Sequence, residues 1–160
     1  MNTRSSRRNF LQAAVAAGTT LPLAGNWTST AATATEKRSA NEKLNLAVIG
    51  VAGRGGSNLA GVSGENIVAL CDIDANRLAA AAAKHKGAKT TDDFRKVLDV
   101  KDLDGVVVST PDHMHAIPVV AALKRGLAVY CENPLTHSIH EARVISRLTA
   151  ERKAVTQMGN

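Results

Sequence analysis

A glycine-rich segment and one aspartate carry the clearest chemistry in the sequence. The segment, Gly50 to Gly56, follows a short apolar run, and glycines let backbone N–H groups approach a pyrophosphate closely. The helix expected beyond it adds the positive end of its dipole. Asp72 lies 22 residues after Gly50, at the end of the next apolar run. A carboxylate there accepts hydrogen bonds from an adenosine ribose and repels a 2′-phosphate, so the pattern predicts a dinucleotide site that favours NAD over NADP.

The glycine-rich segment departs from the strict dinucleotide fingerprint G-x-G-x-x-G at one position. Gly50 and Gly55 occupy the first and third glycine positions, and Gly53 adds flexibility. Ala52 occupies the second position, where we expect its methyl group to push the cofactor outward or to weaken its binding. Arg54 completes the expected cofactor contacts of the loop. The alternative is that the glycines form only a tight turn and that the aspartate caps the next helix.

Apolar runs and helical segments alternate from residue 44 onward. Strands are expected at 44–49, 66–71, 105–109, 127–131 and 154–157, with a weak one near 88–90. Helices are expected from Asp74 to about Lys86 before Gly87, from a cap at Thr91 or Asp92 through Leu98, from His115 to Arg125, and from Ser138 with Glu141 in a capping box. This alternation predicts an α/β fold of Rossmann type, with a doubly wound parallel sheet in the strand order 3-2-1-4-5-6.

Two further segments give the sequence a specific resemblance. The first is Ser-Thr-Pro-Asp-His-Met-His at 109–115, and the second is Cys-Glu-Asn-Pro-Leu-Thr at 131–136; each follows an expected strand. With the glycine-rich segment, they resemble the Gfo/Idh/MocA oxidoreductases over roughly residues 43–160. The resemblance implies hydride transfer between nicotinamide and a sugar, cyclitol or polyol. Members normally carry a second, mostly β substrate domain, which we expect to be absent from this chain.

The resemblance also assigns roles to single residues. Thr110, Pro111 and His115 are expected beside the cofactor cleft, and Glu132 and Pro134 are expected on its nicotinamide side. A packing or capping role for His115 is an equal alternative to a catalytic one. For Glu132 and Pro134 the alternative is a capped turn after a strand.

One position departs from the family where substrate chemistry is expected. The family motif is usually Glu-Lys-Pro, and its lysine commonly lies near the reacting carbon and orients or polarises the substrate hydroxyl. Asn133 occupies that position here. An amide donates a hydrogen bond but cannot exchange a proton at neutral pH. Asn133 is therefore the candidate catalytic position, with His115 as the local substitute, and no catalytic lysine is carried over.

Other residue types argue against several classes of site. Cys71 and Cys131 end strands that are not neighbours in the expected order, so we expect free buried thiols. His113 and His115 lack a third ligand nearby, so no metal site is expected. Aromatic residues make up 2% of the chain, too few for a nucleic-acid stacking platform. The net charge of +6 comes from basic residues scattered along the chain and from arginines near its N-terminus. No nucleic-acid partner is therefore expected.

The N-terminal segment is typical of a twin-arginine export signal. Arg7 and Arg8 precede a weakly apolar stretch at 11–23 that is too short and polar to remain as a stable membrane anchor. Ala32-Thr33-Ala34 offers a cleavage site, so we expect a signal peptide at 1–34, a linker at 35–42 and the Rossmann domain at 43–160. Export by the twin-arginine machinery would deliver a folded protein to the periplasm or the medium. The alternative is that the N-terminus is an amphipathic segment or a basic tail that carries no export signal.

Three functions remain open at this point. The first is an NAD-dependent dehydrogenase domain that acts on a sugar, cyclitol or polyol and is inactive without its substrate domain. The second, within the same family, is a glycoside hydrolase that keeps its NAD bound and reoxidises it in each turnover. The third is a non-catalytic cofactor-binding remnant, suggested by Asn133. A homo-oligomer is left open.

Overall fold

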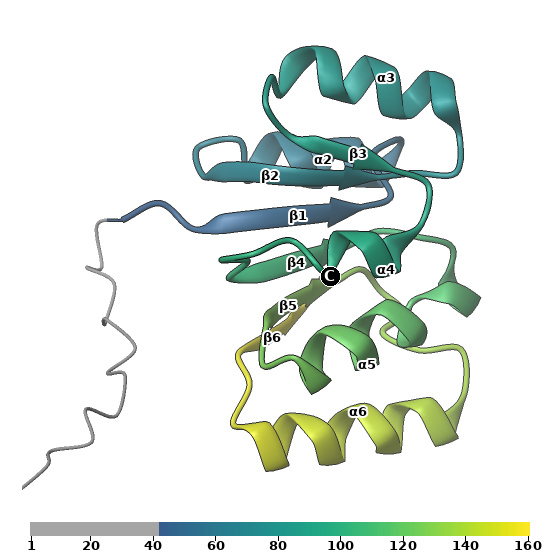
Figure 1. Cartoon of the computed structure of the whole chain (residues 1–160). Coiled ribbons are helices and arrows are strands. Elements are labelled where there is room, and N and C mark those ends of the chain that lie inside the picture. The colour runs from purple at the N-terminus through teal and green to yellow at the C-terminus, as the bar shows by residue number, and fades with distance from the viewer. Residues whose placement is uncertain (1–41) are drawn as a thin grey trace, which may run out of the picture. The chain divides into compact units, whose positions relative to one another are not determined.

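The computed structural model describes residues 42–160, which form a six-stranded sheet with helices on both faces (Figure 1). The strands are β1 (Asn45–Ile49), β2 (Asn66–Cys71), β3 (Lys89–Thr91), β4 (Gly105–Val108), β5 (Ala128–Cys131) and β6 (Thr156–Met158). The helices are α2 (Arg54–Gly61), α3 (Ala75–Lys84), α4 (Phe94–Val97), the 3-10 turn η1 (Asp112–Met114), α5 (Ala116–Lys124) and α6 (Ile139–Arg152). The expected signal peptide, and all of the expected linker but residue 42, lie outside the described residues.

The strand order confirms the Rossmann-type prediction. The order is β3-β2-β1-β4-β5-β6, and every neighbouring pair is parallel. The chain winds from β1 outward through β2 and β3, then returns to the other side of β1 with β4. The direction of winding therefore reverses between β1 and β4, which is where open sheets of this kind bind ligands.

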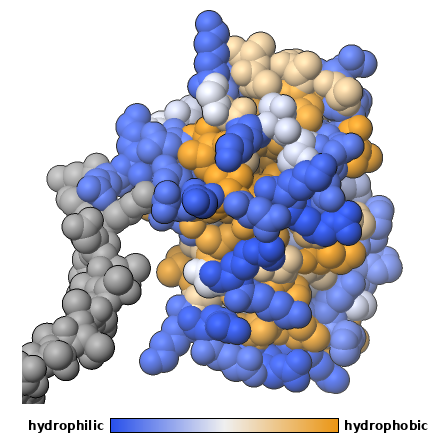
Figure 2. All heavy atoms as spheres, viewed as in Figure 1, coloured by the Kyte–Doolittle hydropathy of each residue, from blue (hydrophilic) through white to orange (hydrophobic). Residues whose placement is uncertain are grey.

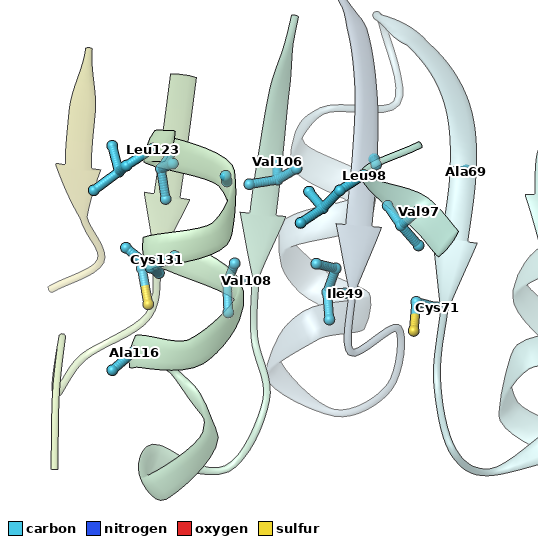
Figure 3. Packing of buried hydrophobic residues seen from close by; sticks show 14 of the residues in the cluster. Ile49, Ala69, Cys71, Val97, Leu98, Val106, Val108, Ala116, Leu123 and Cys131 are labelled. Carbon is cyan, nitrogen blue, oxygen red and sulfur yellow. The ribbon is translucent and has the colours of Figure 1, made fainter. Parts of the chain in front are cut away.

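Two apolar layers hold the sheet between its helices. In β1, Ala47 and Ile49 face one layer while Val48 faces the other, because side chains alternate along a strand. The first layer packs the sheet against α4, α5 and α6; part of it is seen in Figure 3. The second layer packs the sheet against α2 and α3, which contribute the buried Leu59 and Ala81. Burial on both faces explains why the strands are apolar runs rather than alternating ones.

The helix boundaries follow local capping chemistry, and they differ from the predictions most at the start of α4 and the end of α3. Asp74 caps α3, and Ser138 forms the predicted capping box with Glu141 at the start of α6. The prediction of a cap at Thr91 or Asp92 was wrong: Asp93 caps α4, accepting from the N–H of Arg95. Thr91 is unavailable as a cap because it ends β3, where its hydroxyl accepts from the N–H of Asp93. The α3 helix also ends two residues earlier than predicted, at Lys84.

The two cysteines are free and buried, as predicted. Cys71 ends β2 and Cys131 ends β5, and Figure 3 shows them on separate strands with β1 and β4 between. Burial raises the pKa of each thiol to about 12. The thiols are therefore protonated at neutral pH and poor nucleophiles in the folded state.

Three further observations concern residues 42–160: the hydropathy of the surface, membrane-spanning helices and groups that could hold a metal ion. On the face seen in Figure 2, hydrophilic residues are interspersed with hydrophobic ones. No helix in this part of the chain is long and apolar enough to cross a membrane. The same residues contain no group of three or more His, Cys, Asp or Glu side chains placed to hold a metal ion.

Candidate cofactor-binding site

A groove of about 540 Å³ opens at the carboxyl ends of β1, β2 and β4. This is the edge of the sheet at which the winding reverses, so the groove lies where the topology predicts a ligand. Predicted cofactor contacts from three separate segments meet in it. Its lining includes Gly50, Ala52, Asp72, Ser109, Thr110 and Pro111.

Two glycines of the loop are required by close backbone approaches. Gly50 has φ +86°, and a Cβ there would overlap the carbonyl oxygen of Ser109. A Cβ on Gly55 would overlap the carbonyl oxygen of Gly50. The start of α2 is thereby packed directly against the β1 loop and the end of β4. This close packing places the positive end of the α2 dipole at the edge of the sheet where the groove opens.

Gly53 and Ala52 meet no such contact. Gly53 precedes α2 with φ +55°, and open space surrounds the position of a Cβ on it. Ala52 is half-buried and its methyl group lines the groove. The one departure from the glycine fingerprint therefore adds a methyl group to the lining of the groove.

The Asp72 carboxylate is held in place by the backbone on either side of it. Its Oδ2 accepts from the N–H of Val51 at 3.0 Å, and its Oδ1 accepts from the N–H of Asp74 at 3.0 Å. A carboxylate has about four acceptor sites, so these bonds orient the group and leave acceptor capacity on each oxygen. A pre-oriented carboxylate in a groove is suited to binding two neighbouring hydroxyls, as on a ribose.

Thr110 supplies an independent sign of a ligand site. Its Oγ1 is buried and has no hydrogen-bond partner among the described residues. Buried hydroxyls are normally hydrogen-bonded, and leaving one unpaired costs about 1–3 kcal/mol. Thr110 also lines the groove, so a polar ligand group there would satisfy the hydroxyl. Together with the glycine approaches and Asp72, this unpaired hydroxyl fits a dinucleotide laid across the edge of the sheet.

His115 lies beneath the groove rather than in it. It is 1% exposed, and its two ring nitrogens face two backbone carbonyls. The Nδ1 atom lies 2.6 Å from the oxygen of Pro134, and the Nε2 atom lies 2.6 Å from the oxygen of Thr110. The imidazole thereby connects the turn after β4 to the turn after β5. This geometry favours the bracing role that the sequence left open, over direct contact with a substrate.

Glu132 anchors a polar cluster at the end of β5. Its Oε1 accepts from the Asn58 amide at 2.7 Å, from Arg54 Nε at 3.0 Å and from the Tyr130 hydroxyl at 3.1 Å. The Glu132 side chain is 12% exposed, whereas the Arg54 side chain is 61% exposed. The hydrogen bond from Asn58 is the main cause that lowers the pKa of Glu132; burial opposes it, and Arg54 and Tyr130 reinforce it. The carboxylate is therefore ionised at neutral pH.

Asn58 and Tyr130 belong to this cluster but were not predicted from the sequence. Asn58 also donates to the Ser109 hydroxyl at 2.9 Å, which ties α2 to the end of β4. Two spacings could have indicated them. Asn58 follows Arg54 by four residues on one helix face, and Tyr130 precedes Glu132 by two residues on one strand face.

Asn133 and Pro134 form the exposed turn that follows Glu132. Both residues are exposed, and the peptide bond between them is cis. The carbonyl of Pro134 is the one that faces His115. The side chain at 133 is thus carried on a turn that the buried histidine holds, at the edge of the site.

Comparison with known proteins agrees with this arrangement. An oxidoreductase family described as having an NAD-binding Rossmann fold (Gfo/Idh/MocA) matches residues 44–160. An inositol 2-dehydrogenase of Saccharopolyspora erythraea is 36% identical over 74% of this chain and 37% of its own length. A glycosyl hydrolase family 109 protein of Solibacter usitatus is 33% identical over 98% of this chain and 39% of its own.

Solved structures show the same fold. The structure of GenD2 from gentamicin A biosynthesis, in complex with NAD, superposes with a TM-score of 0.68 and 26% identity, covering 74% of this chain and 34% of that one. The chain thus spans less than two fifths of the length of these relatives. The family match extends over most of the described residues, with its glycine loop and Asp72 at the groove. The chain therefore belongs to the Gfo/Idh/MocA oxidoreductase family, and residues 44–160 are an NAD-binding Rossmann domain.

Proposed function

We propose that this domain carries NAD for an oxidoreductase that acts on a hydroxyl of a cyclitol or sugar. The observation that carries the proposal is the groove at the switch point, which is lined by the pre-oriented Asp72 and by Thr110, whose buried hydroxyl has no hydrogen-bond partner among the described residues. The similarity to an inositol 2-dehydrogenase supports the substrate class. Recording NADH absorbance at 340 nm with cyclitols and sugars tests the activity.

The residues of the groove have separate parts in holding the cofactor. The start of α2 would bind the pyrophosphate, because the positive end of the helix dipole lies at this edge of the sheet. Asp72 would bind the adenosine ribose, and Thr110 would donate to the nicotinamide half. Bound nicotinamide supplies a hydride acceptor. The protein's contribution is position and electrostatics.

The carboxylate of Asp72 is expected to select NAD over NADP. An Asp72→Ala variant removes the ribose acceptor and the charge that repels a 2′-phosphate. We expect NAD binding to weaken by about 1–3 kcal/mol and the preference over NADP to shrink. Asp99→Ala is the matched control, because this carboxylate pairs with Arg125 on the surface, outside the groove lining. Titration of each variant with both cofactors measures the effect; tighter binding of NADP than NAD by the wild type would contradict it.

Asn133 limits the chemistry that the turn after β5 can perform on a substrate hydroxyl. Its amide reaches a hydroxyl as a neutral donor, so it orients the hydroxyl without taking its proton. In this proposal the proton of the oxidised hydroxyl passes to a group other than residue 133. His115 is an unsuitable acceptor, because it is 1% exposed and lies outside the groove lining.

A glycoside hydrolase that retains its NAD is the second candidate. The observation that favours it is the similarity to the glycosyl hydrolase family 109 protein, which extends over 98% of this chain. The two candidates differ in net redox change. A dehydrogenase accumulates NADH as substrate is consumed, whereas the hydrolase would release sugar with nicotinamide bound and no net change at 340 nm.

We also propose that the protein is exported through the twin-arginine pathway. The support is sequence alone, with Arg7 and Arg8 before a weakly apolar stretch. Changing both arginines to lysine is expected to leave the precursor in the cytoplasm, measured by cell fractionation. Equal delivery in cells that lack the twin-arginine transporter would disprove it.

A further inference from the structure

The two halves of the sheet end on matching acidic residues. In the first half, β2 ends at Cys71 and Asp72 follows; in the second half, β5 ends at Cys131 and Glu132 follows. The strands correspond because the order β3-β2-β1-β4-β5-β6 places β2 and β5 each one strand away from the switch point. Each half of such a sheet binds one mononucleotide of a dinucleotide. Glu132 therefore has the same position relative to the second mononucleotide that Asp72 has relative to the first.

Asp72 indicates which nucleotide of the cofactor each half of the sheet would bind. Its carboxylate lies at the groove with its oxygens oriented by Val51 and Asp74, which suits the adenosine ribose. The nicotinamide would then belong to the second half of the sheet, at the ends of β4 and β5. Thr110 and Glu132 are the polar residues that follow those strands.

Glu132 brings a fixed negative charge to this second half. Asn58, Arg54 and Tyr130 all hold the same carboxylate oxygen, so the group is fixed in position and 12% exposed. The nicotinamide ring carries a positive charge when oxidised and none when reduced. A nearby carboxylate stabilises only the charged ring, and does so more strongly where water is excluded.

We propose, resting on the proposed function, that Glu132 makes this domain prefer oxidised over reduced nicotinamide, and that Arg54 moderates the preference. Arg54 carries the opposite charge, bonded to Glu132 at the start of α2. Its guanidinium is 61% exposed, so solvent screens it more than the carboxylate. The domain is thereby loaded with oxidised rather than reduced cofactor when the two are present at equal concentrations.

The test is the ratio of dissociation constants for NAD+ and NADH in the 160-residue chain. NADH binding is followed by its fluorescence, and NAD+ binding by displacement of NADH. Glu132→Gln keeps the shape and an oxygen for Asn58 while removing the charge. We expect NAD+ to lose about tenfold in affinity relative to NADH, equivalent to about 1.4 kcal/mol. Arg54→Gln should shift the ratio the other way, whatever it does to both affinities through the pyrophosphate.

The design separates charge from structure. Both cofactors bind the same folded molecules, so the ratio does not depend on the fraction that folds. Glu151→Gln is the matched control: the same chemical change on the surface of α6, where Glu151 lies 3.9 Å from Arg147. Equal weakening of NAD+ and NADH by Glu132→Gln, or ratio shifts of the same sign in the Glu132 and Arg54 variants, would overturn the inference. Failure of the wild type to bind either cofactor would instead overturn the proposed function.

Discussion

Replacing Gly55 with alanine is expected to abolish NAD binding, with a loss of at least about a hundredfold in affinity. The added Cβ would overlap the carbonyl oxygen of Gly50, a backbone atom that cannot rotate away. Gly50 is itself fixed, because its N–H donates to the carbonyl of Cys71 at 2.8 Å and its Cα lies against Ser109. The start of α2 must therefore move away from the sheet, taking the pyrophosphate donors with it.

The same substitution should lower the free energy of unfolding by about 1–3 kcal/mol, the usual range for an overpacked site. The matched control is Gly61→Ala, at the other end of the same helix, where nothing lies within 4 Å of an added Cβ. Alanine there should leave NAD binding unchanged and stability equal or higher. Urea unfolding and an NADH titration measure the two effects. Wild-type affinity in Gly55→Ala would show that the helix start does not bind the cofactor.

Replacing His115 with alanine should be the most destabilising single change at the site, at about 2–5 kcal/mol. The substitution empties a site that is 1% exposed and removes the ring that the carbonyls of Thr110 and Pro134 face. Because those carbonyls belong to the two turns of the site, Thr110 and Asn133 should lose their fixed positions together. Urea denaturation measures the change in the free energy of unfolding.

His113→Ala is the control for this change. His113 lies two residues away and is exposed, so its loss should cost less than about 0.5 kcal/mol. The comparison also separates the two roles left open for His115. A brace predicts a large loss of stability before any substrate is present. A His115→Ala protein as stable as the wild type would contradict the brace and return the histidine to the candidate catalytic residues.

The fold could be predicted from the sequence because its signals are local. Each strand is a short apolar run, and most helices begin at a recognisable cap such as Asp74 or Ser138. The cap of α4 was placed wrongly because Thr91, Asp92 and Asp93 are all good caps. Which of them serves depends on where β3 stops pairing with β2, and that is a tertiary contact.

The site could be predicted where a short segment of sequence is enough to identify the functional residues. The glycine loop and Asp72 have fixed places relative to consecutive strands, and the groove contains both. The Glu132 cluster was not predictable in the same way, because Asn58 reaches it from a helix 74 residues earlier in the chain. The role of His115 depended on burial, since the same motif suits a brace and a catalyst. Burial is set by how the turns after β4 and β5 pack together, which no single segment specifies.

The measurement that tests the account most directly is a titration of the purified 160-residue chain with NAD+, NADH and NADP+. The account predicts saturable binding of NAD+ and NADH at one site, with NADP+ weaker because of the Asp72 carboxylate. It also predicts that Gly55→Ala removes this binding, because the groove loses the helix start that forms its edge. A folded wild-type chain that binds none of the three would contradict the assignment of the groove as a nicotinamide dinucleotide site.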